Sequence, residues 1–343
     1  MYIAITGYTG YIGSVLCSFL TKLDYKILGI DSMLFANSRI PNASYPVVNK
    51  TLHKDIRDID KDDLENVDVL VHLANLSNDP ICDLDTELTF SINHKASVRL
   101  ADIAKQCKIK KFIFASSVSV YGETGKIPVD ENHPTNPLTA YSKAKLMVEQ
   151  DLSNLASDSF NTISLRFSTA YGWSPCMRFD LVINNLVASA FAEKLLIVRD
   201  KPNLWRPFVH VEDIAMAIMA SINLELPKGE TNNIFNIGQN IDNYTLSDLI
   251  TKICDLSPIK LNVTYQTNNL DKRSYWVNSN KMLKELPLFK PSYNVSSGVI
   301  SLFEAYKKNQ ITANIYKSDE FKRINQILRL IKLNIIDKDL RYI

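Results

Sequence analysis

A tyrosine and a lysine stand four residues apart in the run Tyr141-Ser-Lys-Ala-Lys145. The run opens a predicted helix, so the two side chains would share one face of that helix. A phenol has an ordinary pKa of about 10 and is a poor base at neutral pH. A neighbouring ammonium favours the phenolate and lowers that pKa. The pair could therefore exchange a proton with an alcohol, although this spacing also occurs often by chance.

A serine cluster lies upstream in Phe114-Ala-Ser-Ser117-Val-Ser-Val-Tyr-Gly122, directly after a predicted strand. The carboxyl ends of parallel strands are where α/β sheets bind ligands. Ser117 could there hydrogen-bond the oxygen that Tyr141 protonates or deprotonates. The alternative is that the cluster forms only a turn.

Three glycines occur in Gly7-Tyr-Thr-Gly10-Tyr-Ile-Gly13, between a predicted strand and a predicted helix. A phosphate needs close approach to free backbone N–H groups, and glycine allows this because it has no Cβ. A helix that begins near Tyr11 points the positive end of its dipole at such a phosphate. The pattern predicts a dinucleotide site in which Tyr11 and Ile12 face the pyrophosphate.

Two acidic positions could select the nucleotide. Asp31 ends the predicted strand Ile27-Leu-Gly-Ile-Asp31, where a carboxylate can hydrogen-bond the adenosine ribose. The same charge repels a 2′-phosphate, so NAD is favoured over NADP; a solvated strand-end residue is the alternative. Asp55 and the backbone of Ile56 could hold the adenine edge, or Asp55 could belong to a solvated charge run.

Short apolar runs alternate with helical patterns in the first half of the chain, which is typical of βαβ units and a parallel sheet. The predicted strands are Tyr2–Thr6, Lys26–Ile30, Val69–Leu73, Lys111–Ala115, Thr162–Arg166 and Ile234–Ile237. The predicted helices are Ile12–Lys22, Phe90–Cys107, Ala140–Leu155 and Val211–Asn223. From Gly172 onward, prolines separate shorter elements, which predicts a smaller lobe.

Composition narrows the class of protein. The chain has 343 residues, a formal net charge of +2 and 46% apolar residues, as expected for a globular protein. The balanced charge gives no footprint for nucleic acid. Five cysteines without a CxxC pair argue against a zinc or other metal site and favour reduced thiols. Without a signal-like or long apolar run, we expect a cytoplasmic protein with no membrane span.

Residues 309–343 form a basic tail of different character. Five apolar residues are predicted to share one helical face, namely Phe321, Ile324, Leu328, Ile331 and Ile335. One interpretation is an amphipathic helix packed on its own protein or on a sister subunit. The other is a helix that lies on a membrane surface.

The glycine triplet, Asp31, Ser117 and the Tyr141/Lys145 pair, in this order, resemble the extended short-chain dehydrogenase/reductases. Within that group, the GxxGxxG spacing resembles the NAD-dependent epimerase/dehydratase family, which acts on nucleotide sugars. The resemblance runs from Tyr2 to roughly Ala305. It implies an α/β fold with a Rossmann-type doubly wound parallel sheet and a smaller C-terminal substrate-binding lobe.

This resemblance also implies a division of the chain. The NAD-binding domain would cover residues 1–172 and be completed by about 207–238. The nucleotide-sugar-binding lobe would cover 173–206 and 239–308, and a homodimer is common in the family.

Further cofactor positions follow from the resemblance. The segment His72-Leu-Ala-Asn75 is similar to a family motif in which the backbone at Leu73 and Ala74 lines the cofactor. Asn93 matches a helical asparagine that orders the active site and is placed with the cofactor-binding residues. Ser116 and Phe167 are placed there too, Phe167 beside the nicotinamide.

The implied chemistry is oxidation of a sugar alcohol. Tyr141 would remove the proton of the sugar 4-hydroxyl while C4 gives a hydride to NAD. Lys145 would hold the cofactor ribose and lower the pKa of Tyr141, and Ser117 would bind the reacting oxygen.

Substrate positions are carried over in the same way. Asn185 and Arg206 match diphosphate contacts of the family, and Arg273 is expected to be a second phosphate clamp, because a guanidinium donates to phosphate in pairs. Ser77 is expected to border the sugar, and Thr169 is placed against the sugar diphosphate.

Departures from the family pattern narrow the reaction. Val118 and Ser119 stand where the 4,6-dehydratases carry an Asp-Glu pair, so water loss is not expected. Thr169 stands where UDP-galactose 4-epimerases carry Asn. This position and the run Ser174-Pro-Cys-Met-Arg178-Phe-Asp-Leu181 are similar to a bacterial subgroup that includes the GDP-mannoheptose 4-dehydrogenase of capsule synthesis.

The expected function is therefore that of an NAD-dependent 4-epimerase or 4-dehydrogenase of a nucleotide sugar, in surface-polysaccharide precursor synthesis. One alternative is a 4-ketoreductase, which NADPH would favour and Asp31 counts against. Another is a non-catalytic NAD-sensing scaffold, which the Tyr141/Lys145 pair counts against.

Overall fold

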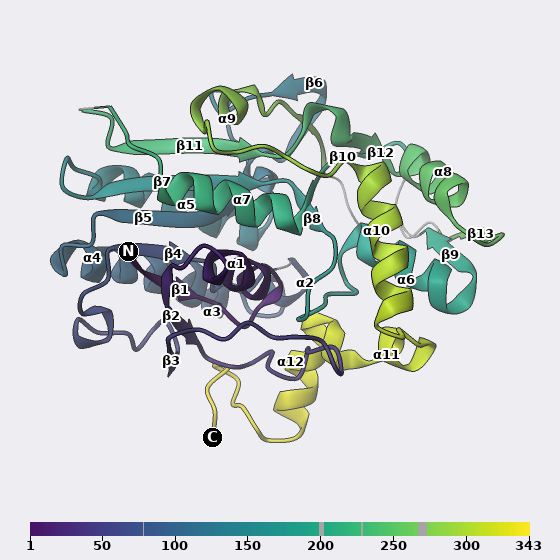
Figure 1. Cartoon of the computed structure of the whole chain (residues 1–343), viewed down its shortest axis with the longest axis horizontal. Coiled ribbons are helices and arrows are strands. Elements are labelled where there is room, and N and C mark those ends of the chain that lie inside the picture. Colours follow the sequence, from purple (N-terminus) through teal and green to yellow (C-terminus); the bar gives the residue numbers. More distant parts are fainter. Residues whose placement is uncertain (78, 199–201, 228, 267–272) are drawn as a thin grey trace.

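A seven-stranded parallel sheet forms the largest part of the protein, in the strand order β11-β7-β5-β4-β1-β2-β3 (Figure 1). The computed structural model describes residues 1–343 apart from 78, 199–201, 228 and 267–272. The strands are β1 (Tyr2–Thr6), β2 (Lys26–Asp31), β3 (Lys50–His53), β4 (Val69–His72), β5 (Lys111–Ser117), β7 (Asn161–Phe167) and β11 (Asn232–Ile237). The predicted Rossmann-type sheet is confirmed.

Helices cover both faces of the sheet because successive side chains of a strand point to opposite sides. Ile3 and Ile5 of β1 pack with α1 (Tyr11–Thr21) and α7 (Val211–Ile222). Ala4, between them, belongs to the opposite core. That second core includes α4 (Ser97–Gln106) and α5 (Ala140–Leu155).

Two elements of the main domain, a strand and a helix, differ from the sequence prediction. The edge strand β3 was not predicted, because its residues Lys50–His53 are polar and mostly exposed. The helix predicted over Phe90–Cys107 is two elements, a π-helical turn at Phe90–Ala96 and then α4. Two short helices precede that turn, α2 (Asp79–Cys82) and α3 (Thr86–Thr89).

A second group of elements surrounds its own apolar core. This lobe packs α6 (Val182–Glu193), α8 (Leu246–Leu256) and α10 (Val295–Lys308) together. Short strands complete it and its border with the main domain: β6 (Glu123–Val129), β8 (Thr169–Tyr171), β9 (Leu195–Val198), β10 (Trp205–His210), β12 (Asn243–Thr245), β13 (Asn262–Tyr265) and β14 (Ser274–Val277).

One piece of the segment expected in the lobe packs elsewhere. The helix α9 (Asn280–Glu285) and the residues after it insert Met282, Leu286 and Phe289 into the core under α1 and α7. This segment therefore joins the main domain, although its neighbours in the chain lie in the lobe.

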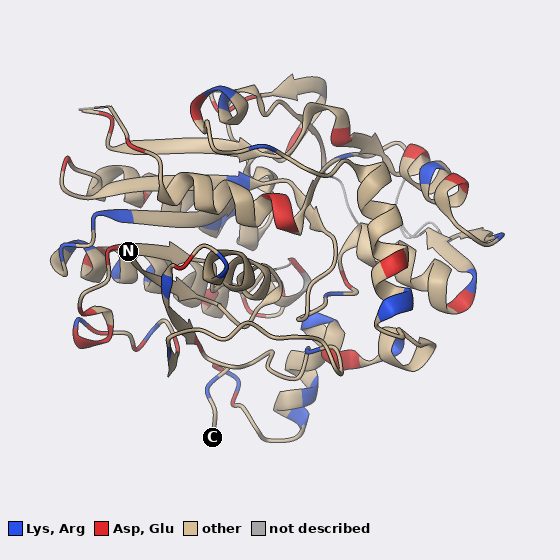
Figure 2. Ribbon diagram, viewed as in Figure 1, with Lys and Arg blue, Asp and Glu red and all other residues tan. Residues whose placement is uncertain are grey.

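The basic tail returns from the lobe to the main domain. It forms α11 (Ala313–Lys317) and α12 (Arg323–Lys332), whose Ile327 and Leu330 join the core under α4 and α5. The packing on its own protein is confirmed. Figure 2 colours the basic residues of α12 blue, and two of them, Arg329 and Lys332, are exposed. Among the described residues, no helix is long and apolar enough to span a membrane.

The predicted apolar face of this tail is partly wrong. Leu328 is 48% exposed and Ile335 is 40% exposed, whereas Ile327 and Leu330 are buried. The helix begins only at Arg323, a residue that is 3% exposed, and burial of this side chain sets which face of α12 turns inward.

Candidate active site

A tight turn between β1 and α1 forms the glycine cradle. Gly7 has φ +74, which side chains rarely tolerate, and its N–H donates to Ile30 O at 2.8 Å. A Cβ on Gly13 would lie 2.2 Å from Gly7 O, so only glycine lets the helix approach the turn this closely. Helix α1 starts directly after Gly10. The turn thus presents the first N–H groups of the helix to a cavity.

That cavity runs along the carboxyl ends of β1, β2, β4 and β5. Its walls include the predicted cofactor residues Gly7, Gly10, Tyr11, Ile12, Gly13, Asp31, Asp55, Ile56, Leu73 and Ala74. It is therefore the one place that brings most of the predicted set together. Within the described residues, no group of acidic, histidine and cysteine side chains could hold a metal ion.

Asp31 is held in position by its own loop. Its Oδ2 accepts from the hydroxyl of Thr9 at 2.7 Å and from the N–H of Thr9 at 3.1 Å, and its Oδ1 accepts from Met33 N at 2.8 Å. A carboxylate has about four acceptor positions, so it retains capacity for a ribose hydroxyl. Asp55 is engaged more fully, by an ion pair with Arg57 at 2.8 Å.

An unsatisfied acceptor gives an independent sign that a polar ligand belongs in the cavity. The Oδ1 atom of Asn75, a wall residue, is buried and has no hydrogen-bond partner among the described residues. A buried acceptor left in this way costs free energy, which a donor on a bound cofactor or substrate would recover. Together with the glycine cradle, it makes the cavity a good fit for a dinucleotide.

Five predicted cofactor residues are not among the wall residues, namely Asn93, Ser116, Tyr141, Lys145 and Phe167. Asn93 is fully buried, and its amide accepts from Leu76 N at 2.8 Å and donates to Leu76 O at 2.9 Å. It thus fixes the loop that carries Leu73 and Ala74. Ser116 and Phe167 are buried at the ends of β5 and β7 and do not line the cavity.

Ser116 and its neighbours form a buried polar network under the site. Its hydroxyl donates to Glu149 at 2.5 Å, and Glu149 forms an ion pair with Arg166 at 2.7 Å. Arg166 also donates to the hydroxyl of Tyr121 at 2.9 Å. Since Glu149 lies one turn beyond Lys145, this network fixes α5 against the ends of β5 and β7.

The predicted catalytic pair is brought together. Thr139 caps α5 by accepting from Ser142 N, which places Tyr141 in the first turn. Ser117 and Tyr141 are close enough for the Ser117 hydroxyl to lower the pKa of the phenol, while the Ser117 Oγ accepts from Ser119 N at 3.2 Å. The hydroxyl proton of Ser117 is therefore free to be donated, either to the phenol or to a ligand oxygen.

Lys145 was expected to lower the pKa of Tyr141, but it is not among the groups that shift this pKa in the cofactor-free structure. Burial and the charge of Asp79 raise the pKa of Tyr141 above its ordinary value, and only Arg178 and the Ser117 hydroxyl oppose them. Lys145 itself is buried, which lowers its pKa to about 7. Its Nζ donates to Ala115 O at 2.5 Å and lies 5.5 Å from the centre of the Tyr141 ring.

Arg178 is a site residue that sequence reasoning left without a role. It is 7% exposed, lines the cavity, and donates to Ser77 at 3.2 Å. An ion pair with Asp180 at 3.0 Å holds it in place. The sequence feature that could have identified Arg178 is the run of residues 174–181, in which an arginine and an aspartate stand two residues apart before α6. Of the expected substrate residues, Ser77 thus borders the cavity.

The two predicted phosphate arginines are adjacent to each other. A guanidinium N–H of Arg206 donates to the backbone carbonyl of Arg273, and its charge lies 5.6 Å from the centre of the Tyr275 ring. Arg273 forms an ion pair with Asp79 at 2.6 Å. Because Asp79 acts on Tyr141, this pair links the arginines to the catalytic end of the cavity.

The last two predicted substrate residues, Asn185 and Thr169, contact other parts of the protein outside the cavity. Asn185, in the first turn of α6, donates to Phe179 O at 2.7 Å. Thr169 begins β8 and pairs with Phe208 of β10. Neither lines the cavity.

Fold and site together define a Rossmann-type dinucleotide-binding protein with a serine–tyrosine–lysine set at the cofactor cavity. The model of the NAD dependent epimerase/dehydratase family matches residues 3–238. The chain belongs to this family, and its cofactor is NAD.

Relatives and solved structures agree with this assignment. A putative UDP-glucose 4-epimerase of Methanocaldococcus jannaschii is 33% identical over 69% of this chain and 76% of its own. The UDP-glucuronic acid 4-epimerase of Bacillus cereus, solved with UDP-glucuronic acid and NAD, has a TM-score of 0.76 and 24% identity. A UDP-N-acetylglucosamine 4-epimerase of Methanobrevibacter ruminantium M1 has a TM-score of 0.78 and 23% identity. Both structures cover 90% of this chain, which covers 99% and 98% of theirs.

Proposed function

We propose that the protein is an NAD-dependent 4-epimerase of a nucleotide-diphosphate sugar. The observation that carries the proposal is the closeness of the Ser117 hydroxyl to the Tyr141 phenol, beside Arg178 in the wall of the cavity that the glycine cradle begins. Tyr141 would act as the base toward a substrate alcohol, and the Ser117 hydroxyl would hydrogen-bond the same alcohol oxygen. Several relatives carry the name UDP-glucose 4-epimerase, which supports the same substrate class.

The chain's own residues would handle the proton and the substrate. In its phenolate form, Tyr141 Oη would take the proton of the sugar 4-hydroxyl and later return it, while Ser117 donates to the same oxygen. NAD, when bound, would supply the acceptor for the C4 hydride and, once reduced, the hydride donor for the keto sugar. Arg206 and Arg273 carry the charge that suits the diphosphate.

Residue types beside Ser117 disfavour dehydration. Val118 and Ser119 provide no carboxylate for acid–base work, and both are buried in the 3-10 turn Val118–Tyr121. Release of the keto sugar would make the same site a 4-dehydrogenase, and reduction of an incoming keto sugar would make it a 4-ketoreductase. A role in surface-polysaccharide precursor synthesis and a homodimer remain parts of the proposal.

The test is a product analysis with purified protein and NAD. UDP-glucose, UDP-N-acetylglucosamine, UDP-glucuronic acid and GDP-mannose are each incubated, and products are separated by chromatography. The proposal expects a 4-epimer without net formation of NADH. Stoichiometric NADH with a keto sugar would instead identify a dehydrogenase. Turnover only of added keto sugars with NADH or NADPH would identify a reductase and overturn the proposal.

A further inference from the structure

The C-terminal tail touches the cofactor cavity. Its helix α12 begins at Arg323, which lines that cavity together with Phe35. Just before the helix, Phe321 O accepts from Phe179 N at 3.0 Å, and Glu320 O accepts from the hydroxyl of Ser38 at 2.5 Å. The tail is therefore attached to the loop after β2, through Ser38, and to the segment before α6, through Phe179.

Arg323 has no ion pair with a carboxylate among the residues that the structure describes. Its guanidinium donates to Ser38 Oγ at 3.0 Å and to the weak acceptor Cys176 Sγ at 3.8 Å, and lies 4.0 Å from the centre of the Phe35 ring. These contacts use two of five N–H donors. Asp180 accepts from the backbone N–H of Arg323 at 3.3 Å, and the charge of Arg323 helps to lower the pKa of its carboxyl, but its ion pair is with Arg178.

A guanidinium that is 3% exposed, without an ion pair of its own among the described residues, is costly unless an anion joins it. Its position indicates which anion that is. Cys176 and Ser174 belong to one loop, and Ser174 donates to Tyr11 O at 2.8 Å, in the first turn of α1. Arg323 thus faces the region where the glycine cradle presents its N–H groups to a pyrophosphate.

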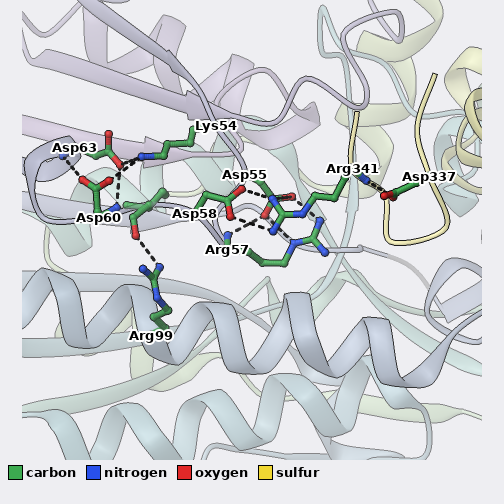
Figure 3. A network of polar contacts seen from close by, with 10 residues as sticks. Lys54, Asp55, Arg57, Asp58, Asp60, Asp63, Arg99, Asp337 and Arg341 are labelled. Carbon is green, nitrogen blue, oxygen red and sulfur yellow. Dashed lines mark hydrogen bonds and ion pairs between the residues drawn. The ribbon is translucent and has the colours of Figure 1, made fainter. Parts of the chain in front are cut away.

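The end of the tail is fastened to the adenosine half of the cavity. Figure 3 shows Arg341 beside Asp58 and Asp55, with Asp337 accepting from its backbone. Arg341 forms an ion pair with Asp58, and its Nη1 lies 3.7 Å from Asp55, a wall residue. The hydroxyl of Tyr342 donates to Met33 O at 2.9 Å, in the loop that follows Asp31.

We propose that the C-terminal tail completes the NAD site: Arg323 binds the pyrophosphate of the cofactor, and Arg341 holds the tail against the two loops beside the adenosine. This proposal depends on the cofactor and not on the sugar substrate or the reaction. It therefore stands or falls separately from the epimerase assignment.

The first test measures ligand binding by calorimetry on cofactor-free protein. Arg323→Met should weaken the binding of ADP and NAD about tenfold or more, because a charge-assisted contact to the diphosphate is lost, and leave adenosine binding unchanged. Arg329→Met is the matched control, since Arg329 lies on the same helix, is exposed, and pairs with Glu320. Unchanged ADP affinity in folded Arg323→Met would overturn the Arg323 contact.

Hydrogen exchange of the wild-type protein tests the same contact without depending on how the variant folds. Binding of ADP should slow hydrogen exchange of residues 319–325 more than binding of adenosine does. Equal protection by both ligands would contradict a diphosphate contact from Arg323.

The second test addresses the contacts of Arg341 with Asp58 and Asp55, which hold the tail beside the adenosine half of the cavity. Arg341→Met should release bound NAD several-fold faster in a chase with excess NADH followed by fluorescence, while Lys338→Met should not. A release rate equal to that of wild type would remove Arg341 from the proposal.

Discussion

Lys145 Nζ donates to the carbonyl oxygen of Ala115 at 2.5 Å, inside the sheet-facing side of α5. The ammonium is thereby held beneath the cavity, where desolvation lowers its pKa to about 7. The buried ammonium is placed to bind a cofactor ribose, but its desolvation lowers the free energy of unfolding of the cofactor-free protein.

Lys145→Met should therefore stabilise the cofactor-free protein while abolishing turnover. The folded-state pKa of about 7 lies below the ordinary 10.5, so the folded protein binds fewer protons than the unfolded chain between these values. The cost of Lys145 is full below about pH 7 and shrinks as pH rises toward 10.5. Thermal unfolding at pH 6.5 and pH 9.5 should show the larger gain at pH 6.5. Lys143→Met, at an exposed position, is the control, and a larger gain at pH 9.5 would refute the argument.

Tyr141→Phe should lower turnover by about 10²–10⁴-fold, the usual contribution of a positioned proton-transfer group. The ring and its packing are kept, so the affinity for NAD should not change. Steady-state kinetics and calorimetry check the two halves of this prediction. Tyr25→Phe, whose hydroxyl contacts Asn223 away from the cavity, should leave both quantities unchanged. Wild-type turnover in Tyr141→Phe would sink the catalytic assignment.

Asp79→Asn should shift the pH dependence of activity. The charge of Asp79 raises the pKa of Tyr141, so its removal lowers that pKa and moves the acid limb of kcat/KM to lower pH. Activity measured across the acid limb tests the direction. Asp83→Asn, at an exposed position nearby in the chain, should leave the limb where it is. A shift to higher pH would show that Asp79 acts on another group.

Asp31→Asn should raise the affinity for NADP relative to NAD. The negative charge that repels a 2′-phosphate is lost, and a change of about tenfold corresponds to ~1.4 kcal/mol. Binding constants of both dinucleotides give the ratio, with Asp62→Asn as an exposed control. If the ratio in Asp31→Asn equals that of wild type, Asp31 does not select the cofactor.

The sheet and its cradle were predictable because local patterns specify them. Apolar runs marked the buried parallel strands, and Gly7 and Gly13 stand where a turn admits no side chain. The polar edge strand β3 carried no such mark, because its side chains are exposed and its register depends on β2.

The site was predictable only as far as residue types specify it. The structure brings Tyr141, Lys145 and Ser117 together, but burial and the charge of Asp79 raise the pKa of Tyr141 and Arg178 opposes them. Asp79 and Arg178 come from distant segments of the chain. Asn93 was found through its helix, yet its partner is the backbone of Leu76. Arg323 was missed as a wall residue, because only tertiary packing brings α12 to the cavity.

Attachment of the tail to both parts of the molecule limits how they can move. Phe321 packs in the lobe core with Phe179, whereas Ile327 and Leu330, within two turns, pack in the main-domain core. A hinge that opened the lobe away from the sheet would have to pull one of these anchors out. Ligand exchange should therefore proceed by small loop displacements, and both cores should unfold in a single cooperative transition.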